Sequence, residues 1–314
     1  MIEREEMMNS TGNSSSTLIQ AMTPSGISER QNEPKNLRLL AAQRQLYTEE
    51  KHWTYLWYVV ATTIALLVSG ALNAFSGYAA MITLFAAIVA MAEIFLLPVI
   101  RKRRILAAGI QEVFDCEVLQ LPWNRALTQP PDNHEIDWAV DRFKRRKNQT
   151  KEWDRLRNWY CYSPLIKTAA LPQARLECQQ ENLHWDAGLR GLWRGLLWSG
   201  LAILVVILLI IGFNAQWSVT QYFSGPMLLI LPIMFAVFRT SIDHHRVMER
   251  LAYLSNVLEQ LREDAQKAHE VTKEDAMLFP TRELQTEIFH HRCNDSPVPD
   301  EIYDWLRNKY QPPQ

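Results

Sequence analysis

The densest set of side chains suited to binding a ligand lies between residues 141 and 162. This stretch combines cations with aromatic rings: Arg142, Lys144, Arg145, Arg146, Lys147, Arg155, Arg157, Trp153, Trp159 and Tyr160. Cations pair with phosphates and rings stack on bases, so the composition fits an oligonucleotide site. A basic helix that lies on anionic lipid headgroups has the same composition. From composition alone we favour the membrane-surface interpretation.

Polar side chains inside long apolar runs form a second candidate group. Glu93 is the only ionisable residue well inside such a run. An intramembrane carboxylate is a candidate for an ion pathway, although protonation or a hydrogen bond to another helix explains it equally well. Thr62, Ser69 and Asn73 recur on one face of the first run. They suit either the wall of a wet pore or contacts between packed helices, and we favour packing.

The sequence carries no motif of an enzyme or a metal site. Gly-rich phosphate loops, nucleophile elbows, HExxH motifs and paired cysteines are absent. His244-His245 and His290-His291 are adjacent pairs, whose side chains point about 100° apart on a helix. Neither pair has Cys or carboxylate partners at the spacing of a metal site. We therefore predict no enzymatic activity, no metal and no bound cofactor.

Composition limits the cellular setting. The formal net charge is −1, so no overall basic surplus attracts the chain to duplex nucleic acid. The four cysteines, Cys116, Cys161, Cys178 and Cys293, are far apart and match no disulfide framework. They are predicted to be free thiols, as expected in a reducing compartment.

The candidate residues must be positioned by four long apolar runs at about 54–75, 78–100, 192–213 and 221–238. Each is long enough to cross a hydrocarbon core of about 30 Å as a helix. A run such as LLWSGLAILVVILLIIGF has no solvent-facing stripe, unlike the core helix of a soluble protein. Short breaks join the runs in pairs, which predicts two transmembrane hairpins.

Charged residues orient these hairpins. Basic residues flank the runs at one end only: Arg101, Lys102, Arg103, Arg104, Arg190, Arg194, Arg239 and Arg246. The two hairpin tips carry no Lys or Arg. Positive charge favours the cytoplasmic side, so both tips are predicted to lie outside and both termini in the cytoplasm. Trp and Tyr near the ends of the runs agree with this placement.

These patterns predict a mainly α chain: a polytopic membrane protein with four transmembrane helices in two hairpins and a mostly helical cytoplasmic domain. The expected parts are a disordered tail (1–34), a cytoplasmic juxtamembrane helix (35–53), the first hairpin (54–100), a cytoplasmic helical domain (101–191), the second hairpin (192–238) and cytoplasmic C-terminal helices (239–314). The helix after the second run is expected to continue until Pro122. From Pro280 onward we expect two short helices separated by the turn-forming SPVPD.

A heptad seam marks the segment after the fourth run. Its apolar residues alternate at spacings of four and three: Val247, Leu251, Leu254, Leu258, Leu261, Ala265 and Ala268. Such a helix needs a partner helix. The partner is either another helix of the same cytoplasmic domain or the same helix of a neighbouring subunit.

Several strings resemble a known family. They are IQEVFDCEVLQLPWN at 110–124, NWYCYSPL at 158–165, ARLECQQENLHWDAGLR at 174–190 and VPDEIYDWLR at 298–307. Together with the two hairpins, they resemble the SMODS-associated four-transmembrane effector family over residues 35–310. That family is encoded beside cyclic-oligonucleotide synthases in bacterial antiphage systems of the CBASS type.

The resemblance implies an effector in the bacterial inner membrane that senses a cyclic oligonucleotide, forms homo-oligomers and permeabilises the membrane. With that ligand expected, a phosphate-binding site in the cytoplasmic domain becomes the leading interpretation of the basic aromatic stretch. Residues inside the family-like strings, of types suited to stacking on bases or holding phosphates, become the candidate ligand contacts: Asp115, Trp123, Trp159, Arg175, Asp186 and Arg190. For each one, bracing of the cytoplasmic helices is the competing interpretation.

Two other functions remain open from the sequence. The chain could be an oligomeric membrane scaffold, assembled through the heptad seam and holding lipid with its basic segment. It could also be a channel or transporter gated by another signal, in which case Glu93 would matter most.

Overall fold

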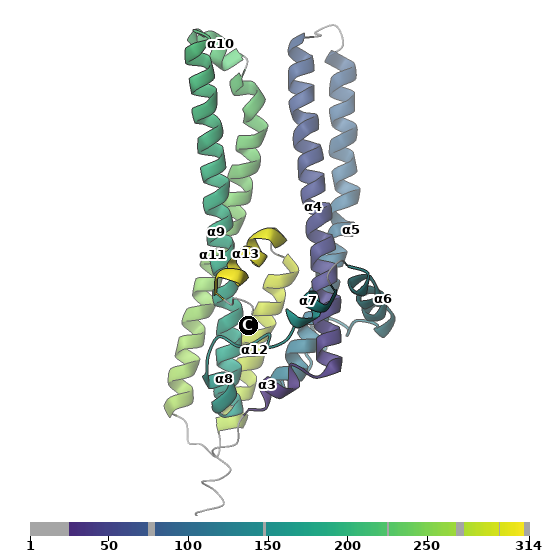
Figure 1. The fold of residues 1–314 in the computed structure, drawn as a ribbon, viewed down its shortest axis with the longest axis vertical. Helices are drawn as coiled ribbons and strands as arrows, with labels where there is room; N and C mark the ends of the chain where they lie inside the picture. The colour runs from purple at the N-terminus through teal and green to yellow at the C-terminus, as the bar shows by residue number, and fades with distance from the viewer. Residues whose placement is uncertain are drawn as a thin grey trace, which may run out of the picture. The chain divides into compact units, whose positions relative to one another are not determined.

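Figure 1 shows the computed structural model of the chain, which describes residues 25–74, 79–146, 149–224, 226–267, 273–294 and 296–310. All regular secondary structure in these ranges is helical. The prediction of a mainly α chain is therefore confirmed.

Four long helices dominate the fold. They are α4 (Pro34–Ala74, 41 residues), α5 (Ala79–Leu119, 41 residues), α9 (Leu171–Asn214, 44 residues) and α11 (Pro226–Lys267, 42 residues). The shorter helices are α3 (Ile27–Arg30), α6 (Asn133–Lys144), α7 (Gln149–Asp154), α8 (Leu165–Thr168), α10 (Val219–Ser224), α12 (Lys273–Asn294) and α13 (Asp300–Tyr310). At 1.5 Å per residue each long helix extends about 60 Å, roughly twice the thickness of a hydrocarbon core.

The chain divides into two compact units. Unit 1 comprises Met1–Gln45, Ala107–Trp185 and Leu251–His290, and unit 2 comprises Leu46–Leu106, Asp186–Arg250 and His291–Gln314. Each of the four long helices therefore contributes one segment to each unit. A single helix thus changes from one chemical environment to another along its length.

Unit 1 has the core of a water-soluble helical domain. On α5 the fully buried residues Ala107, Ile110, Phe114 and Val118 recur every three or four positions, as expected of a helix that presents one face to a core. Leu40 from α4 and Leu176 from α9 are buried with them. The helix ends at Leu119, close to the end predicted at Pro122.

The heptad seam also lies in the core of the chain. Leu251, Leu254 and Leu258 on α11 are at most 2% exposed. Its neighbour is α9, since Arg262 donates to Glu177 at 2.6 Å and Gln180 donates to Glu259 at 3.2 Å. Of the two predicted partners, the structure therefore has the helix of the same chain. Ala268 lies outside the described residues.

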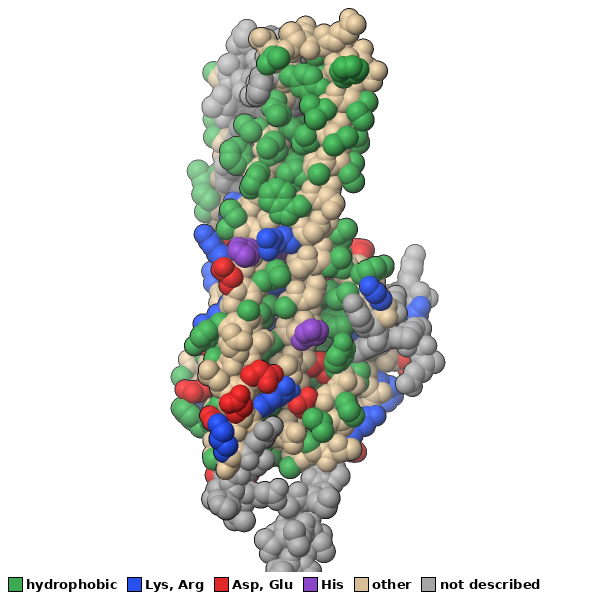
Figure 2. All heavy atoms as spheres, turned by 90° about the vertical axis from the view of Figure 1, so that its left-hand side faces the viewer, with side chains coloured by type: hydrophobic (Ala, Val, Ile, Leu, Met, Phe, Trp, Pro, Cys, Tyr) green, Lys and Arg blue, Asp and Glu red, His purple; other side chains and the backbone are tan. Residues whose placement is uncertain are grey.

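Unit 2 exposes large apolar side chains. Phe213 is 85% exposed, Val219 74% and Phe235 67% on the hairpin of α9 to α11, and Phe95 is 71% exposed on α5. Figure 2 shows hydrophobic side chains covering the visible face of the α9–α11 hairpin. An apolar surface of this kind marks contact with lipid or with another protein.

Among the described residues, one helix meets the length and composition criteria for crossing a membrane. Leu171–Asn214 is long and apolar enough to span a bilayer, and only 11% of its most apolar stretch is buried. The core helix of a soluble protein would be mostly buried. The other three predicted spans, and with them the four-span topology, stay predictions.

Two boundaries differ from the sequence prediction. Residues 25–34 were expected in a disordered tail, but Ile27–Arg30 form helix α3 and Ile27 is fully buried, so the folded region starts earlier. The rest of the predicted tail, residues 1–24, lies outside the described residues. Pro280 was expected to begin a helix, but it lies inside α12. The predicted final helix is present as α13.

Candidate functional site

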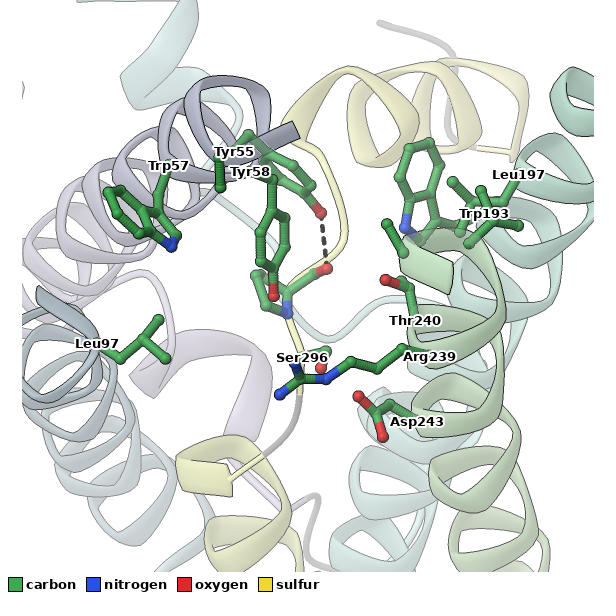
Figure 3. A pocket seen from close by; sticks show the side chains of 14 residues that line it. Tyr55, Trp57, Tyr58, Leu97, Trp193, Leu197, Arg239, Thr240, Asp243 and Ser296 are labelled. Carbon is green, nitrogen blue, oxygen red and sulfur yellow. Dashed lines mark hydrogen bonds between the residues drawn. The ribbon is translucent and has the colours of Figure 1, made fainter. Parts of the chain in front are cut away.

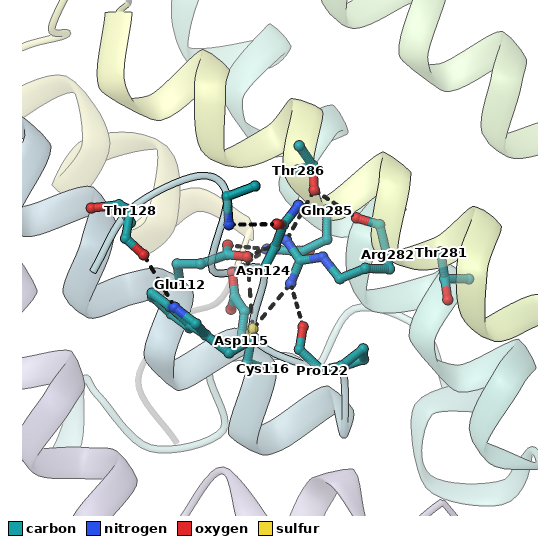
Figure 4. Close-up of polar contacts among 12 residues, drawn as sticks. Glu112, Asp115, Cys116, Pro122, Asn124, Thr128, Thr281, Arg282, Gln285 and Thr286 are labelled. Carbon is teal, nitrogen blue, oxygen red and sulfur yellow. Dashed lines mark hydrogen bonds and ion pairs between the residues drawn. The ribbon is translucent and has the colours of Figure 1, made fainter. Parts of the chain in front are cut away.

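A buried polar network joins α5 to α12 in unit 1 (Figure 4). Gln285 bridges two carboxylates, since its amide donates to Glu112 Oε2 and to Asp115 Oδ2, each at 2.9 Å. Arg282 forms the ion pair with Glu112 and donates to Cys116 Sγ at 3.1 Å. All five side chains are at most 9% exposed. The network satisfies charged groups that would otherwise be costly to bury.

Asp115 is fully occupied by this network. Its second oxygen, Oδ1, accepts from the Tyr160 hydroxyl at 2.5 Å, and that hydroxyl in turn accepts from Asn182 at 3.0 Å. Asp115 is 0% exposed. The carboxylate therefore connects α5, α12 and the segment before α8, which fits the bracing interpretation. A contact with ligand stays a prediction.

Arg175 caps the C-terminal end of α5 by donating hydrogen bonds to its last carbonyl groups. Gln120 adopts the left-handed conformation (φ 54°), and Leu121 N–H donates to Cys116 O at 2.9 Å, as in a Schellman C-cap. Arg175 donates to Leu119 O at 2.6 Å and to Gln120 O at 3.1 Å, and pairs with Glu274 at 2.8 Å. A buried cation on the last carbonyls of a helix is stabilising. Arg175 is 1% exposed, so a soluble ligand has little access to it.

The two predicted stacking tryptophans are partly buried against their own chain. The Trp123 indole donates to Thr128 O at 3.2 Å within the loop after α5. Trp159 contacts Phe114 edge to face, with ring centroids 6.5 Å apart. The structure gives both rings partners inside unit 1.

The basic aromatic stretch folds as α6, α7 and the turns after them. Arg142 lies over the Trp138 ring at 3.5 Å, and Trp153 packs edge to face on Phe143 at 5.4 Å. Lys144 and Arg145 are exposed. Part of the stretch is thus core, and its exposed cations remain available to phosphates of either a nucleotide or a lipid.

Asp186 and Arg190 come together in unit 2. Arg190 donates from Nε to Asp186 at 2.9 Å and from Nη1 to Ser296 O at 2.8 Å, and lies 3.0 Å from His244 Nδ1. His291 contacts the same Asp186 oxygen. Burial alone would raise the pKa of Asp186, but the charges of Arg190 and His291 outweigh it and hold the pKa well below its usual range. The Asp186 carboxylate therefore stays ionised.

This cluster holds the extended segment between α12 and α13. Ser296 is anchored by Arg190, and the Tyr55 hydroxyl donates to Pro297 O at 2.7 Å. Thr48 and Lys51 on α4 donate to Asp300, the first residue of α13, at 2.6 and 2.7 Å. The segment is fixed to both α4 and α9 within unit 2.

A cavity of about 430 Å³ lies beside this segment (Figure 3). Helices α4, α5, α9 and α11 and the extended segment line it, with Tyr55, Trp57, Tyr58, Leu97, Trp193, Leu197, Arg239, Thr240, Asp243, Ser296 and Pro297 among the lining residues. Its volume is typical of small-molecule sites. It is the candidate functional site of the chain.

Sequence reasoning missed this cavity. None of the six predicted ligand residues lines it, although Arg190 holds Ser296 in its wall. Its rings come from Tyr55, Trp57, Tyr58 and Trp193. From the sequence, Trp57, Tyr58 and Trp193 were interpreted as residues at the membrane interfaces, and Tyr55 was not singled out. The available signal was positional: each of the four apolar runs contributes residues from the end that the positive charges mark as cytoplasmic.

Glu93, Thr62, Ser69 and Asn73 lie on α4 and α5, but their side chains are outside the described part of the structure. The proposed pore or packing roles stay predictions.

The cysteines are free thiols, as predicted. Burial raises the pKa of Cys116 to about 12, and neighbouring Glu112 adds to the shift. Cys161 is the exposed one. Across the described ranges, no three His, Cys, Asp or Glu side chains gather as a metal ion would require.

The chain belongs to the family of SMODS-associating 4TM effector domains, which it matches over residues 25–312. This match covers most of the chain and confirms the resemblance found in the strings at 110–124, 158–165, 174–190 and 298–307.

A curated relative supports the same placement. A probable CBASS effector molecule from Bacillus cereus (strain VD146) is 23% identical over 301 residues, which cover 90% of this chain and 92% of the relative. No solved structure matches the chain.

Proposed function

We propose that this chain is a membrane effector of a CBASS-like antiphage system. A cyclic oligonucleotide, made by a functionally linked synthase, activates it to oligomerise and permeabilise the bacterial inner membrane, which leads to abortive infection. Family membership and the relative named as a probable CBASS effector support the setting. The chain acts through conformation and assembly rather than through catalysis.

One structural observation carries the proposal. Each long helix joins a segment in the polar, well-packed unit 1 to a segment in unit 2, where large apolar side chains are exposed. In the proposed topology the unit 2 segments are the four spans, with both hairpin tips outside and both termini in the cytoplasm. A ligand-dependent change at the cytoplasmic side then reaches the bilayer without crossing a flexible linker.

Activation requires two states with different affinities for the messenger. A ligand that binds both states equally shifts nothing, however tightly it binds. The resting chain must therefore bind the messenger more weakly than the assembled one. Assembly in the bilayer uses the exposed apolar surface of unit 2, because the heptad seam is already buried within the chain.

The scaffold alternative loses its main support for the same reason, since the seam is not available to a second subunit. The channel or transporter alternative depends on Glu93. Exchange of Glu93→Gln should alter conductance only if that carboxylate lines the pathway.

The proposal is tested in cells that carry the chain together with a cyclic-oligonucleotide synthase. We expect a membrane-impermeant dye to enter when the synthase is active and to stay out when its catalytic residues are removed. Equal amounts of membrane-inserted protein in both strains are the control. Dye entry that does not depend on synthase activity would contradict gating by the messenger.

A further inference from the structure

Arg239, an exposed residue on α11, brings a cation to the cavity of unit 2. Figure 3 shows its guanidinium reaching toward Ser296 in the middle of the lining residues. Within the described part of the chain, no hydrogen bond or ion pair satisfies this guanidinium. Arg239 and Asp243 are one helical turn apart on α11 and both line the cavity, yet they form no ion pair. The cation is available to an anion from outside the chain.

The walls around this cation are aromatic. Tyr55, Trp57 and Tyr58 come from α4 and Trp193 from α9. The Trp193 indole N–H is buried and has no acceptor among the described residues. A buried donor without an acceptor is costly, and an added acceptor atom would relieve that cost.

From this geometry we infer that the cavity binds a phosphodiester whose neighbouring group presents an N–H donor. Arg239 pairs with the phosphate oxygens, as guanidinium groups do with phosphates. Asp243 accepts from the N–H donor. Arg239 and Asp243 are the charged side chains among the lining residues, so the cavity offers one contact for a phosphate and one for an N–H donor. The rings then cover the flat or apolar body of the ligand.

Two sources offer this chemistry. A cyclic oligonucleotide has phosphodiesters beside bases that carry N–H groups, and this source rests on the function proposed above. A phospholipid with an ethanolamine headgroup has a phosphodiester beside an ammonium group. The cavity lies at the cytoplasmic ends of the four proposed spans, where both ligands have access to it.

The test uses the full chain in lipid nanodiscs made of phosphatidylcholine, whose headgroup has no N–H donor. One arm measures binding of labelled cyclic di- and trinucleotides by equilibrium dialysis. The other arm adds phosphatidylethanolamine to the discs and counts the lipid retained on the extracted protein by native mass spectrometry. Arg239→Gln and Asp243→Asn are compared with Arg250→Gln, which changes an exposed arginine three turns along the same helix that lines neither this cavity nor the adjoining pocket.

We expect one of the two ligands to bind the wild type and the Arg250→Gln control equally. Arg239→Gln should weaken that binding at least tenfold, because a charge-assisted contact is lost. Asp243→Asn should weaken it several-fold. Retention of ethanolamine lipid that depends on Arg239 supports the inference even where no nucleotide binds, in which case only the nucleotide part of the proposed function fails.

Nucleotide binding that is unchanged in Arg239→Gln would overturn the inference while leaving the proposed function intact. Absence of binding of both ligands to the wild type would overturn it as well. Equal thermal unfolding midpoints for all variants show that a loss of binding reflects the site rather than the fold.

Discussion

Arg282 is the cation on which the buried network of unit 1 depends. It is 7% exposed and faces Glu112, which is 2% exposed, while Gln285 ties Glu112 to Asp115. Removal of one partner from a buried ion pair leaves an uncompensated charge, which costs much more than the pair itself contributes. The network is thus a strong determinant of how α5 and α12 pack.

We predict that Arg282→Met destabilises the chain by about 3–5 kcal/mol. Thermal unfolding in detergent or nanodiscs measures the effect, with Arg145→Met as the control because Arg145 is exposed. The control should change stability by less than about 0.5 kcal/mol. Similar midpoints for both variants would show that the Arg282 pair contributes little.

Glu181 gives the fold a pH dependence. It accepts hydrogen bonds from the backbone of Cys161 and Tyr162, but burial prevails and raises the pKa of Glu181 to about 7. A carboxyl whose pKa is higher in the folded chain than in the unfolded chain favours folding when protonated. Its contribution is present at low pH and is lost as the pH rises from about 5 through 7.

Glu181→Gln should therefore flatten the decline in stability between pH 5 and pH 8. Unfolding midpoints measured across this range, with exposed Glu283→Gln as the control, give the comparison. An unchanged slope in Glu181→Gln would assign the pH dependence to other groups.

Prediction from sequence was limited at this scale. Asp115 and Arg175 were selected because they lie in the family-like strings and are of types suited to holding a ligand, but residue type does not tell whether their partner is a ligand or the chain itself. The cavity residues Trp193 and Arg239 come from different helices, and only the tertiary fold brings them together. The periodicity of apolar residues along one helix does not tell which residues of other helices will lie beside it.

At the scale of elements, the long helices followed directly from hydrophobic patterning. The helical extension predicted after the second apolar run is present as the C-terminal part of α5. The predicted final helix is present as α13. Helix α6 begins at Asn133, and Asp132 caps it by accepting from His134 N–H. The pattern Asp132 to Glu135 is a helix-start signal that would have located it.

The seam on α11 gives the prediction for this scale. Leu258→Ala should cost about 2–5 kcal/mol because Leu258 is 0% exposed within the chain. Exposed Gln260→Ala is the matched control on the same helix. A change in oligomeric mass without a change in unfolding midpoint would instead indicate a seam between subunits.

For the whole molecule, the proposed orientation follows from charges around the apolar segments. Cys161 is the exposed native thiol and lies on the proposed cytoplasmic side, whereas Ala215 lies at the tip between α9 and α10. In intact spheroplasts, a membrane-impermeant maleimide should label Ala215→Cys and leave Cys161 unlabelled until the membrane is opened. Labelling of Cys161 in intact spheroplasts would reverse the topology.

The proposed gating uses the four long helices, each of which contributes a segment to both units. The cavity touches all four of them at one level, so a ligand there has contacts that can differ between two arrangements of the hairpins. Coupling then needs only rigid helices, each of which continues into the polar unit 1.

The measurement that bears most directly on this function is leakage of a dye from liposomes that carry the purified chain, with and without a panel of cyclic di- and trinucleotides. We expect one member of the panel to trigger leakage, and liposomes without protein to stay intact. Folded, inserted protein that causes no leakage with any member would contradict a messenger-gated membrane effector.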